Sequence, residues 1–145
     1  MRNLFQTIFV GFVLSGCGGS SNSSSNTDVD AGRIVGAWEY IYSNYSDAQC
    51  LDLTIFRGDG TFRVEARDEI QTGEYSFSTP TDGTARYVVE ITFETDNQLA
   101  DCDGETSNEA GLEALFYVEF PSDEVMSMYE NVSGGSVIGS FNRRS

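Results

Sequence analysis

Residues 85–94 read ARYVVEITFE, and apolar side chains alternate along them. Tyr87, Val89, Ile91 and Phe93 occupy every second position, and most of the residues between them are polar or charged. Successive side chains of a strand point to opposite faces, so this alternation predicts a strand with one buried face. A helix would instead need apolar residues three and four positions apart. A strand over residues 85–95 is therefore the first predicted element.

The same alternation recurs on both sides of this strand, and no stretch of helical period is long enough to compete with it. Turn residues such as Gly58-Asp59-Gly60 and Pro80-Thr81-Asp82-Gly83 separate the alternating runs at hairpin spacing. Eight strands are predicted, over residues 36–43, 50–57, 61–68, 72–78, 85–95, 112–120, 125–131 and 137–143. Consecutive antiparallel strands on short connections predict an all-β, up-and-down β-barrel, because closure removes exposed sheet edges. A β-sandwich is the alternative.

The N-terminal region precedes these strands and has a different composition. Residues 4–14 are mostly apolar and follow Met1-Arg2-Asn3, but they are too few for a spanning helix of about 20 residues. Leu14-Ser15-Gly16-Cys17 comes next and resembles the lipobox of bacterial lipoprotein signal peptides. The resemblance implies removal of residues 1–16 and attachment of fatty acyl chains such as palmitate to Cys17.

A polar tract connects this predicted lipidation site to the strands. Residues 17–32 read CGGSSNSSSNTDVDAG and hold too little apolar surface to fold, so they predict a flexible tether. Gly18 follows Cys17, and the absence of Asp there implies, by the same resemblance, a lipid anchor in the bacterial outer membrane. The periplasmic and outer sides of that membrane both remain open. Residues 33–145 are then one domain, long enough to bury its own core.

Three short motifs resemble the small bacterial lipocalin-like domains of the calycin group. They are Gly36-Ala37-Trp38, Asp59-Gly60-Thr61-Phe62 and Gly73-Glu74-Tyr75, and the resemblance covers residues 34–143 in order. It implies that Arg143 of the last strand packs across Trp38, beside Gly36, at the closed end of a barrel. The alternative reading makes Trp38 an ordinary core aromatic and Arg143 a charge of the tail.

The charge of the chain restricts its partners and its chemistry. All 8 basic residues are Arg, there is no Lys or His, and 23 residues are acidic. Loss of Arg2 with residues 1–16 would leave 7 Arg against 23 acids, a net charge of −16. Such a charge repels phosphate backbones, so no nucleic-acid partner is expected.

Without His there is no catalytic triad, and no catalytic residue or cofactor is predicted. Paired carboxylates leave a hydrolase as a residual possibility.

Two cysteines remain after Cys17. Cys50 and Cys102 in an exported chain predict one disulfide. A redox or metal role is not favoured, because the chain has no C-x-x-C pair and no His. The long acidic connection at residues 95–111 contains Asp101-Cys102-Asp103-Gly104-Glu105, but its spacing fails the EF-hand pattern and no metal site is predicted.

The predicted function rests on the interior of the barrel. The inward faces are expected to line a small apolar pocket entered near Cys102, because ligand sites are concave and mostly apolar. Its predicted lining residues are Phe62, Tyr75, Tyr87, Val89, Phe116 and Met128. The chain is thus predicted to be a membrane-anchored envelope lipoprotein that binds a small apolar or amphipathic ligand. In the alternative, the same side chains fill the barrel and the outer surface binds another envelope protein.

Overall fold

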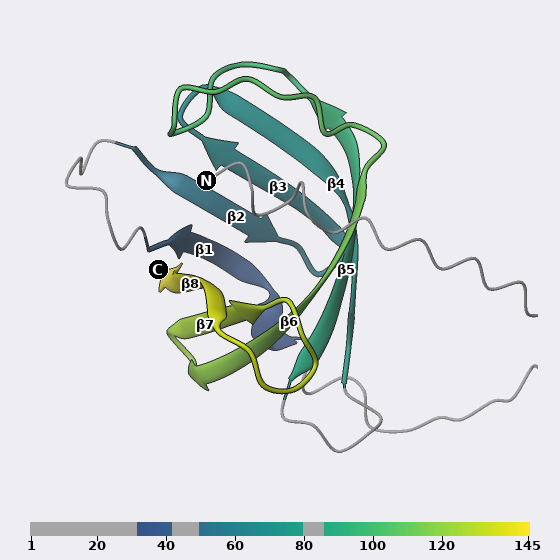
Figure 1. Ribbon diagram of the computed structural model, residues 1–145, viewed down its shortest axis with the longest axis vertical. Helices are drawn as coiled ribbons and strands as arrows, with labels where there is room; N and C mark the ends of the chain where they lie inside the picture. Colours follow the sequence, from purple (N-terminus) through teal and green to yellow (C-terminus); the bar gives the residue numbers. More distant parts are fainter. Residues whose placement is uncertain (1–31, 42–49, 80–85) are drawn as a thin grey trace, which may run out of the picture.

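A computed structural model describes residues 32–41, 50–79 and 86–145, which form a closed barrel of eight strands (Figure 1). The strands are β1 (Gly36–Tyr40), β2 (Asp52–Phe56), β3 (Thr61–Ala66), β4 (Glu69–Ser78), β5 (Tyr87–Asp96), β6 (Glu113–Ser122), β7 (Val125–Tyr129) and β8 (Val137–Arg144). Each strand pairs antiparallel with the next, and β1 also pairs with β8. The predicted all-β, up-and-down barrel is confirmed, and the sandwich alternative is wrong.

The largest difference from the predicted strands lies between β3 and β4. From the sequence, one strand is predicted to end at residue 68 and the next to begin at residue 72. In the structure Ala66 pairs with Glu69, so the connection is a two-residue turn of Arg67 and Asp68. Arg67 has a φ of 59°, in the left-handed region that such tight hairpin turns use. β4 therefore begins earlier than predicted, and Glu69 and Gln71 become buried strand residues.

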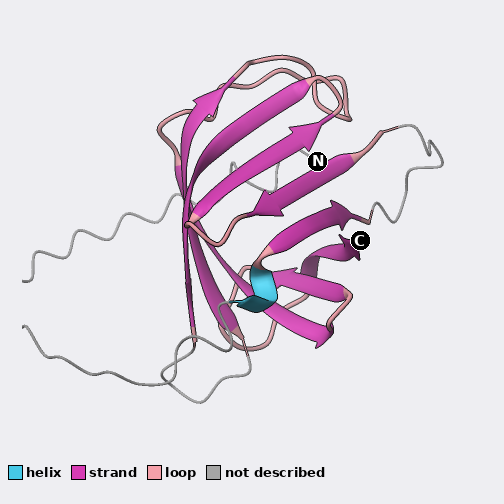
Figure 2. Cartoon of the chain, turned by 180° about the vertical axis from the view of Figure 1, so that it is seen from behind, coloured by secondary structure: helices cyan, strands magenta, loops and turns pink. Residues whose placement is uncertain are grey.

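One end of the barrel is closed by a helical turn that includes residues 32–34 (Figure 2). Ile34 and Trp38 are fully buried there, and the indole Nε1 of Trp38 donates a hydrogen bond of 2.7 Å to the carbonyl of Ile34. Arg33 places its guanidinium 5.0 Å from the ring centre of Phe120. The chain leading into β1 therefore covers this opening of the barrel.

Arg143 completes the closure from β8. Its guanidinium lies 4.2 Å from the ring centre of Trp38, and it donates hydrogen bonds to the carbonyls of Val35, Arg33 and Asp123. Gly36 has a φ of 141°, and a Cβ there would lie 2.6 Å from Nη1 of Arg143. These three residues meet in the arrangement that the resemblance to lipocalin-like domains implies. The reading of Arg143 as a charge of the tail does not fit these contacts.

Several predicted features lie outside the described residues. They are the signal of residues 1–16, the lipidation site Cys17, residues 17–31 of the tether, the end of the first predicted strand and the turn at 80–83. Among the residues that are described, no helix is long and apolar enough to cross a membrane.

Candidate functional site

The barrel encloses a cavity of about 150 Å³ at the end opposite Trp38. Its floor and walls are mostly apolar, and its mouth is polar. The apolar lining residues are Tyr40, Phe56, Phe62, Val64, Ala66, Ile91, Phe93, Phe116, Met126, Met128 and Phe141. The polar ones are Asp52, Thr54, Glu69, Gln71, Asp101, Asp103, Ser107 and Glu109.

The inward side chains of β3 become smaller towards this end, which leaves space for the cavity. On β3 the inward series runs from Phe62 through Val64 to Ala66, which pairs with Asp52 beside the mouth. At the closed end the inward positions are large aromatic rings instead. Phe77 stacks on Tyr87 with ring centres 5.1 Å apart, and both rings contact Phe120. The half of the barrel near Trp38, here called the lower half, is therefore filled. The half near the mouth, here called the upper half, contains the cavity.

Three of the six residues predicted to line a pocket do line this cavity. Phe62, Phe116 and Met128 are among its walls.

The other three, Tyr75, Tyr87 and Val89, are not among the residues that line it. Tyr75 packs edge-on against Phe56 and donates its hydroxyl to the carbonyl of Arg57. Tyr87 belongs to the filled end, and Val89 is completely buried. Alternation along a strand identifies the inward face, but it does not give the depth of a residue within a barrel.

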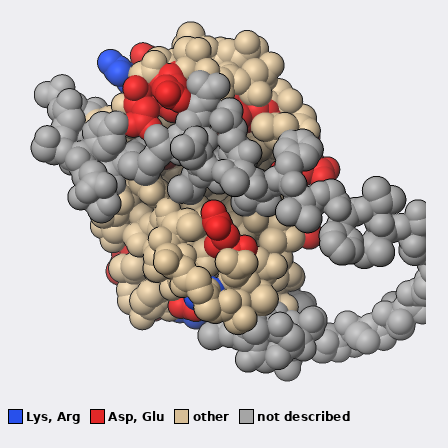
Figure 3. Space-filling model, in the orientation of Figure 1, with Lys and Arg blue, Asp and Glu red and all other residues tan. Residues whose placement is uncertain are grey.

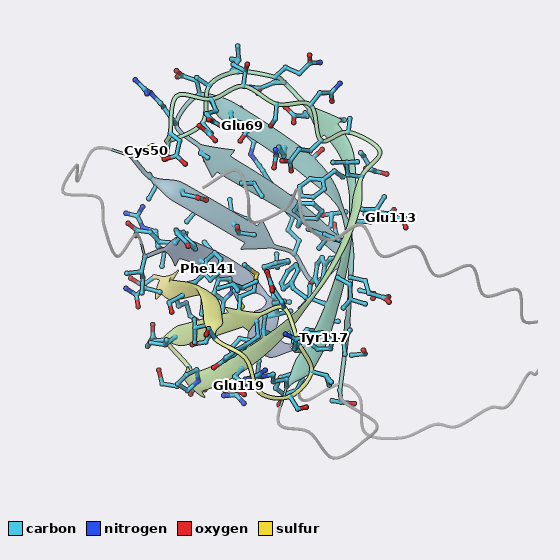
Figure 4. All side chains as sticks on the ribbon, viewed as in Figure 1. Cys50, Glu69, Glu113, Tyr117, Glu119 and Phe141 are labelled. Atoms are coloured by element: carbon cyan, nitrogen blue, oxygen red, sulfur yellow. A yellow bond between two sulfur atoms is a disulfide. The ribbon has the colours of Figure 1, made fainter. Side chains whose placement is uncertain are left out.

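Glu69 is the most unusual polar residue of the lining. It begins β4 and only 6% of it is exposed. Its Oε1 accepts a hydrogen bond of 3.3 Å from the hydroxyl of Ser107. Burial, followed by the charges of Asp96, Glu109 and Asp101, raises the pKa of Glu69 to about 7. Figure 4 shows this residue at the end of the barrel that the loop between β5 and β6 covers.

The loop from residue 97 to residue 112 brings further carboxylates to the mouth. Asp96 holds the base of the loop, because its carboxylate accepts hydrogen bonds from the backbone N–H groups of Gln98 and Glu109. Asp101 accepts hydrogen bonds from the backbone N–H groups of Asp103 and Glu105, each 2.9 Å long. These contacts fold the loop over the mouth by means of its own acidic side chains.

A disulfide fixes this loop to the start of β2. Cys50 and Cys102 are joined, with their Cα atoms 5.6 Å apart and 52 positions apart in the chain. The predicted disulfide is therefore present in the structure. It ties the neighbours of Cys102, which are Asp101 and Asp103, to the rim of the barrel beside Asp52.

The acidic mouth contributes to a negative surface. On the face shown in Figure 3, acidic side chains outnumber basic ones, and several gather at the upper end of the barrel. Within residues 32–41, 50–79 and 86–145, no group of acidic or cysteine side chains has the arrangement of a metal site.

Glu69 and Gln71 were not predicted as lining residues, because residues 69–71 fell between two predicted strands. One signal for them was present. Glu69, Gln71, Gly73, Tyr75 and Phe77 form a single series at every second position, which extends the predicted strand back to residue 69. The first two members of this series are polar, so the pattern did not indicate that they lie on the inward face of a strand.

Comparison with protein-family models, with curated proteins and with solved structures finds no match for this chain. The fold and the cavity are therefore the basis for a functional proposal.

Proposed function

We propose that the chain is a lipid-anchored protein of the bacterial outer membrane whose barrel binds a small apolar or amphipathic molecule. The proposed role is binding and not catalysis. The sequence pattern Leu14-Ser15-Gly16-Cys17 and the polar tract after it support the anchor. The motifs shared with lipocalin-like domains support a ligand-binding barrel, and the closed eight-stranded architecture is compatible with that resemblance.

The cavity is the observation that carries the proposal. Its volume of about 150 Å³ is bounded by a filled, aromatic floor on one side and by a disulfide-linked loop on the other. Small-molecule sites are typically concave and apolar with a few polar groups at defined positions, and this lining has that composition. The alternative of a completely filled barrel agrees with the closed end but not with the upper half.

A cavity-filling variant tests the ligand-binding role. Ala66 is buried and lines the cavity, so Ala66→Phe should occupy the space that a ligand needs. Ala37→Phe is the matched control, because Ala37 lies next to the inward Trp38 on β1 and therefore points outward.

The full-length chain in phosphatidylcholine nanodiscs would be titrated calorimetrically with small aromatic and aliphatic compounds, with empty nanodiscs as the blank. Binding by the parent and by Ala37→Phe, but not by Ala66→Phe, is expected. No binding by any of the three proteins would refute the ligand-binding role.

The proposed anchor has its own test at Cys17. Two or more acyl chains give stable membrane attachment, whereas one is marginal. Cys17→Ser should therefore abolish the incorporation of labelled palmitate and release the protein from the membrane fraction. Retention of an unlabelled but processed Cys17→Ser chain in the membrane would refute the proposed lipidation.

A further inference from the structure

The lining of the cavity differs in character between its walls and its mouth. The walls are formed by aromatic and aliphatic side chains from every strand of the barrel except β4. Five carboxylates line the same space, from Asp52, Glu69, Asp101, Asp103 and Glu109. None of the described residues that line the cavity is basic.

Among these carboxylates, Glu69 is the one that a cationic ligand would stabilise most. It is 6% exposed, and the only hydrogen bond of its side chain within the described ranges is the one of 3.3 Å from Ser107 to Oε1. Its second oxygen, Oε2, has no partner among the described residues, and none of the ion pairs found there includes Glu69. A buried carboxylate without a cation is unfavourable, and neighbouring carboxylates make it more so.

We propose that the cavity takes a small organic ammonium ion, whose apolar body lies among the aromatic walls and whose charged nitrogen lies against the carboxylate of Glu69. The inference rests on the proposed ligand-binding function and specifies the chemical class of its ligand. An apolar protein cavity of about 150 Å³ holds one benzene molecule, so the apolar body is about the size of a phenyl ring.

Charge complementarity favours this class over the two obvious alternatives. A carboxylate ligand of the same shape would meet the five acidic groups of the mouth and be repelled. A neutral alcohol would gain the apolar contacts but would leave Glu69 without a counter-ion. An ammonium ion gains the same apolar contacts and adds a charge-assisted hydrogen bond to a carboxylate that is largely shielded from water.

Three ligands with nearly the same apolar body test the inference. They are 2-phenylethylammonium, 2-phenylethanol and 3-phenylpropanoate, titrated against the full-length chain in phosphatidylcholine nanodiscs at pH 8. The ammonium ion should bind at least about ten-fold more tightly than the alcohol, and the carboxylate most weakly. Equal affinity for the ammonium ion and the alcohol would overturn the inference while leaving the proposed ligand-binding function standing. No binding of any of the three would overturn both.

Two matched variants locate the charge. Glu69→Gln keeps the shape of the side chain and removes its charge, so it should abolish the preference for the ammonium ion while the alcohol still binds. Glu74→Gln is the control, because Glu74 is on the same strand but is exposed on the outer face. A preference that survives in Glu69→Gln, or that is lost in Glu74→Gln, would contradict the assignment.

The pH dependence gives a readout that needs no variant. The groups that face Glu69 are Asp96 of β5 and Asp101, Ser107 and Glu109 of the loop, and Asp52 and Asp103 line the same cavity. Because the pKa of Glu69 is raised to about 7, its carboxyl group is mostly protonated at pH 5.5. The affinity for 2-phenylethylammonium should therefore fall about ten-fold or more between pH 8 and pH 5.5, and that for 2-phenylethanol should not. A fall for neither ligand would count against Glu69 as the partner of the cation.

Discussion

Arg143 shows at the scale of one residue how the closed end is held together. Its guanidinium lies over Trp38 and donates to three backbone carbonyls of the segments that enclose it, those of Arg33, Val35 and Asp123. The side chain of Arg144, the next residue, is half exposed and lies 3.6 Å from the carboxylate of Glu39 in an ion pair. Two adjacent arginines thus have very different surroundings.

We expect Arg143→Ala to lower the free energy of unfolding by about 1–3 kcal/mol, since it removes a cation–π contact and the charged donors of three carbonyls. Arg144→Ala should cost less than about 1 kcal/mol, as exposed ion pairs usually do. Urea denaturation of both variants measures the difference. Equal effects of the two substitutions would disagree with the described closure.

Glu69 gives a second prediction at this scale, because its pKa changes on folding. Burial first, and then the neighbouring carboxylates, raise this pKa from 4.5 to about 7, so the folded chain binds the proton more tightly than the unfolded chain. The resulting stability is fully present below about pH 4.5 and is lost as the pH rises through about 7.

Glu69→Gln should therefore be more stable than the parent at pH 8, by about 1–3 kcal/mol, because one pKa unit corresponds to about 1.4 kcal/mol. The two proteins should differ little at pH 4. Thermal or urea unfolding at both pH values measures this. A parent that is more stable than Glu69→Gln at pH 8 would show that the carboxylate is not destabilised by its surroundings.

At the scale of the element, the pairing of β4 with β5 depends on Gly73. The register of the two strands shifts between Thr72 and Gly73, which brings the backbone of β5 unusually close. A Cβ at Gly73 would lie only 1.9 Å from the carbonyl oxygen of Thr92 and 2.8 Å from the ring of Phe62. No side chain fits there without movement of the backbone.

Gly73→Ala should therefore destabilise the barrel by more than about 2 kcal/mol, as expected for overpacking against backbone atoms. Gly58→Ala is the control, since nothing lies within 4 Å of a Cβ at Gly58. Chemical denaturation of both variants decides the point, and a neutral Gly73→Ala would mean that the two strands are not paired as described.

The loop between β5 and β6 is the second element with a specific prediction. Cys50 and Cys102 close a long section of chain, with a separation of 52 residues. Replacement of both by Ala should lower the melting temperature, because the chain-entropy estimate for such a loop is about 4 kcal/mol. Dithiothreitol should lower the melting temperature of the parent and leave that of the double variant unchanged. An effect of dithiothreitol on neither protein would argue against a disulfide.

The elements also show what the sequence could predict and what it could not. Strands with apolar alternation, such as residues 85–95, were located to within about two residues, because their pattern follows directly from the geometry of a strand. The start of β4 was missed, because Glu69 and Gln71 are polar residues on the inward face of a strand. Their burial depends on a cavity and a covering loop, which are tertiary features.

The same limit applies to the candidate site. Phe62, Phe116 and Met128 were predicted to line a pocket because they lie on inward faces. Val89 shares such a face, but it lies at a level where neighbouring rings leave no space. The level of a residue depends on the stagger of all eight strands around the barrel, and no local pattern encodes that stagger.

At the scale of the whole molecule, the barrel divides into a filled lower half and an open upper half. The filled half is held by Trp38, Arg143 and the helical turn before β1, and the open half carries the cavity under the disulfide-linked loop. The closed end therefore holds the barrel together, and the cavity is the proposed binding site. Substitutions near Trp38 should change the stability, and substitutions around the cavity should change the ligand affinity.

A ligand is proposed to occupy the half of the barrel under the loop between β5 and β6, and methyl NMR of the full-length chain in nanodiscs tests this proposal. On addition of 2-phenylethylammonium, the methyl groups of Met126 and Met128 should shift and show contacts to the aromatic protons of the ligand, because both line the cavity. Val89 lies outside the lining and Val137 is exposed, so their methyl groups should change little. Shifts confined to Val137 and other exposed methyl groups, or no shifts with any ligand of the series, would contradict the claim.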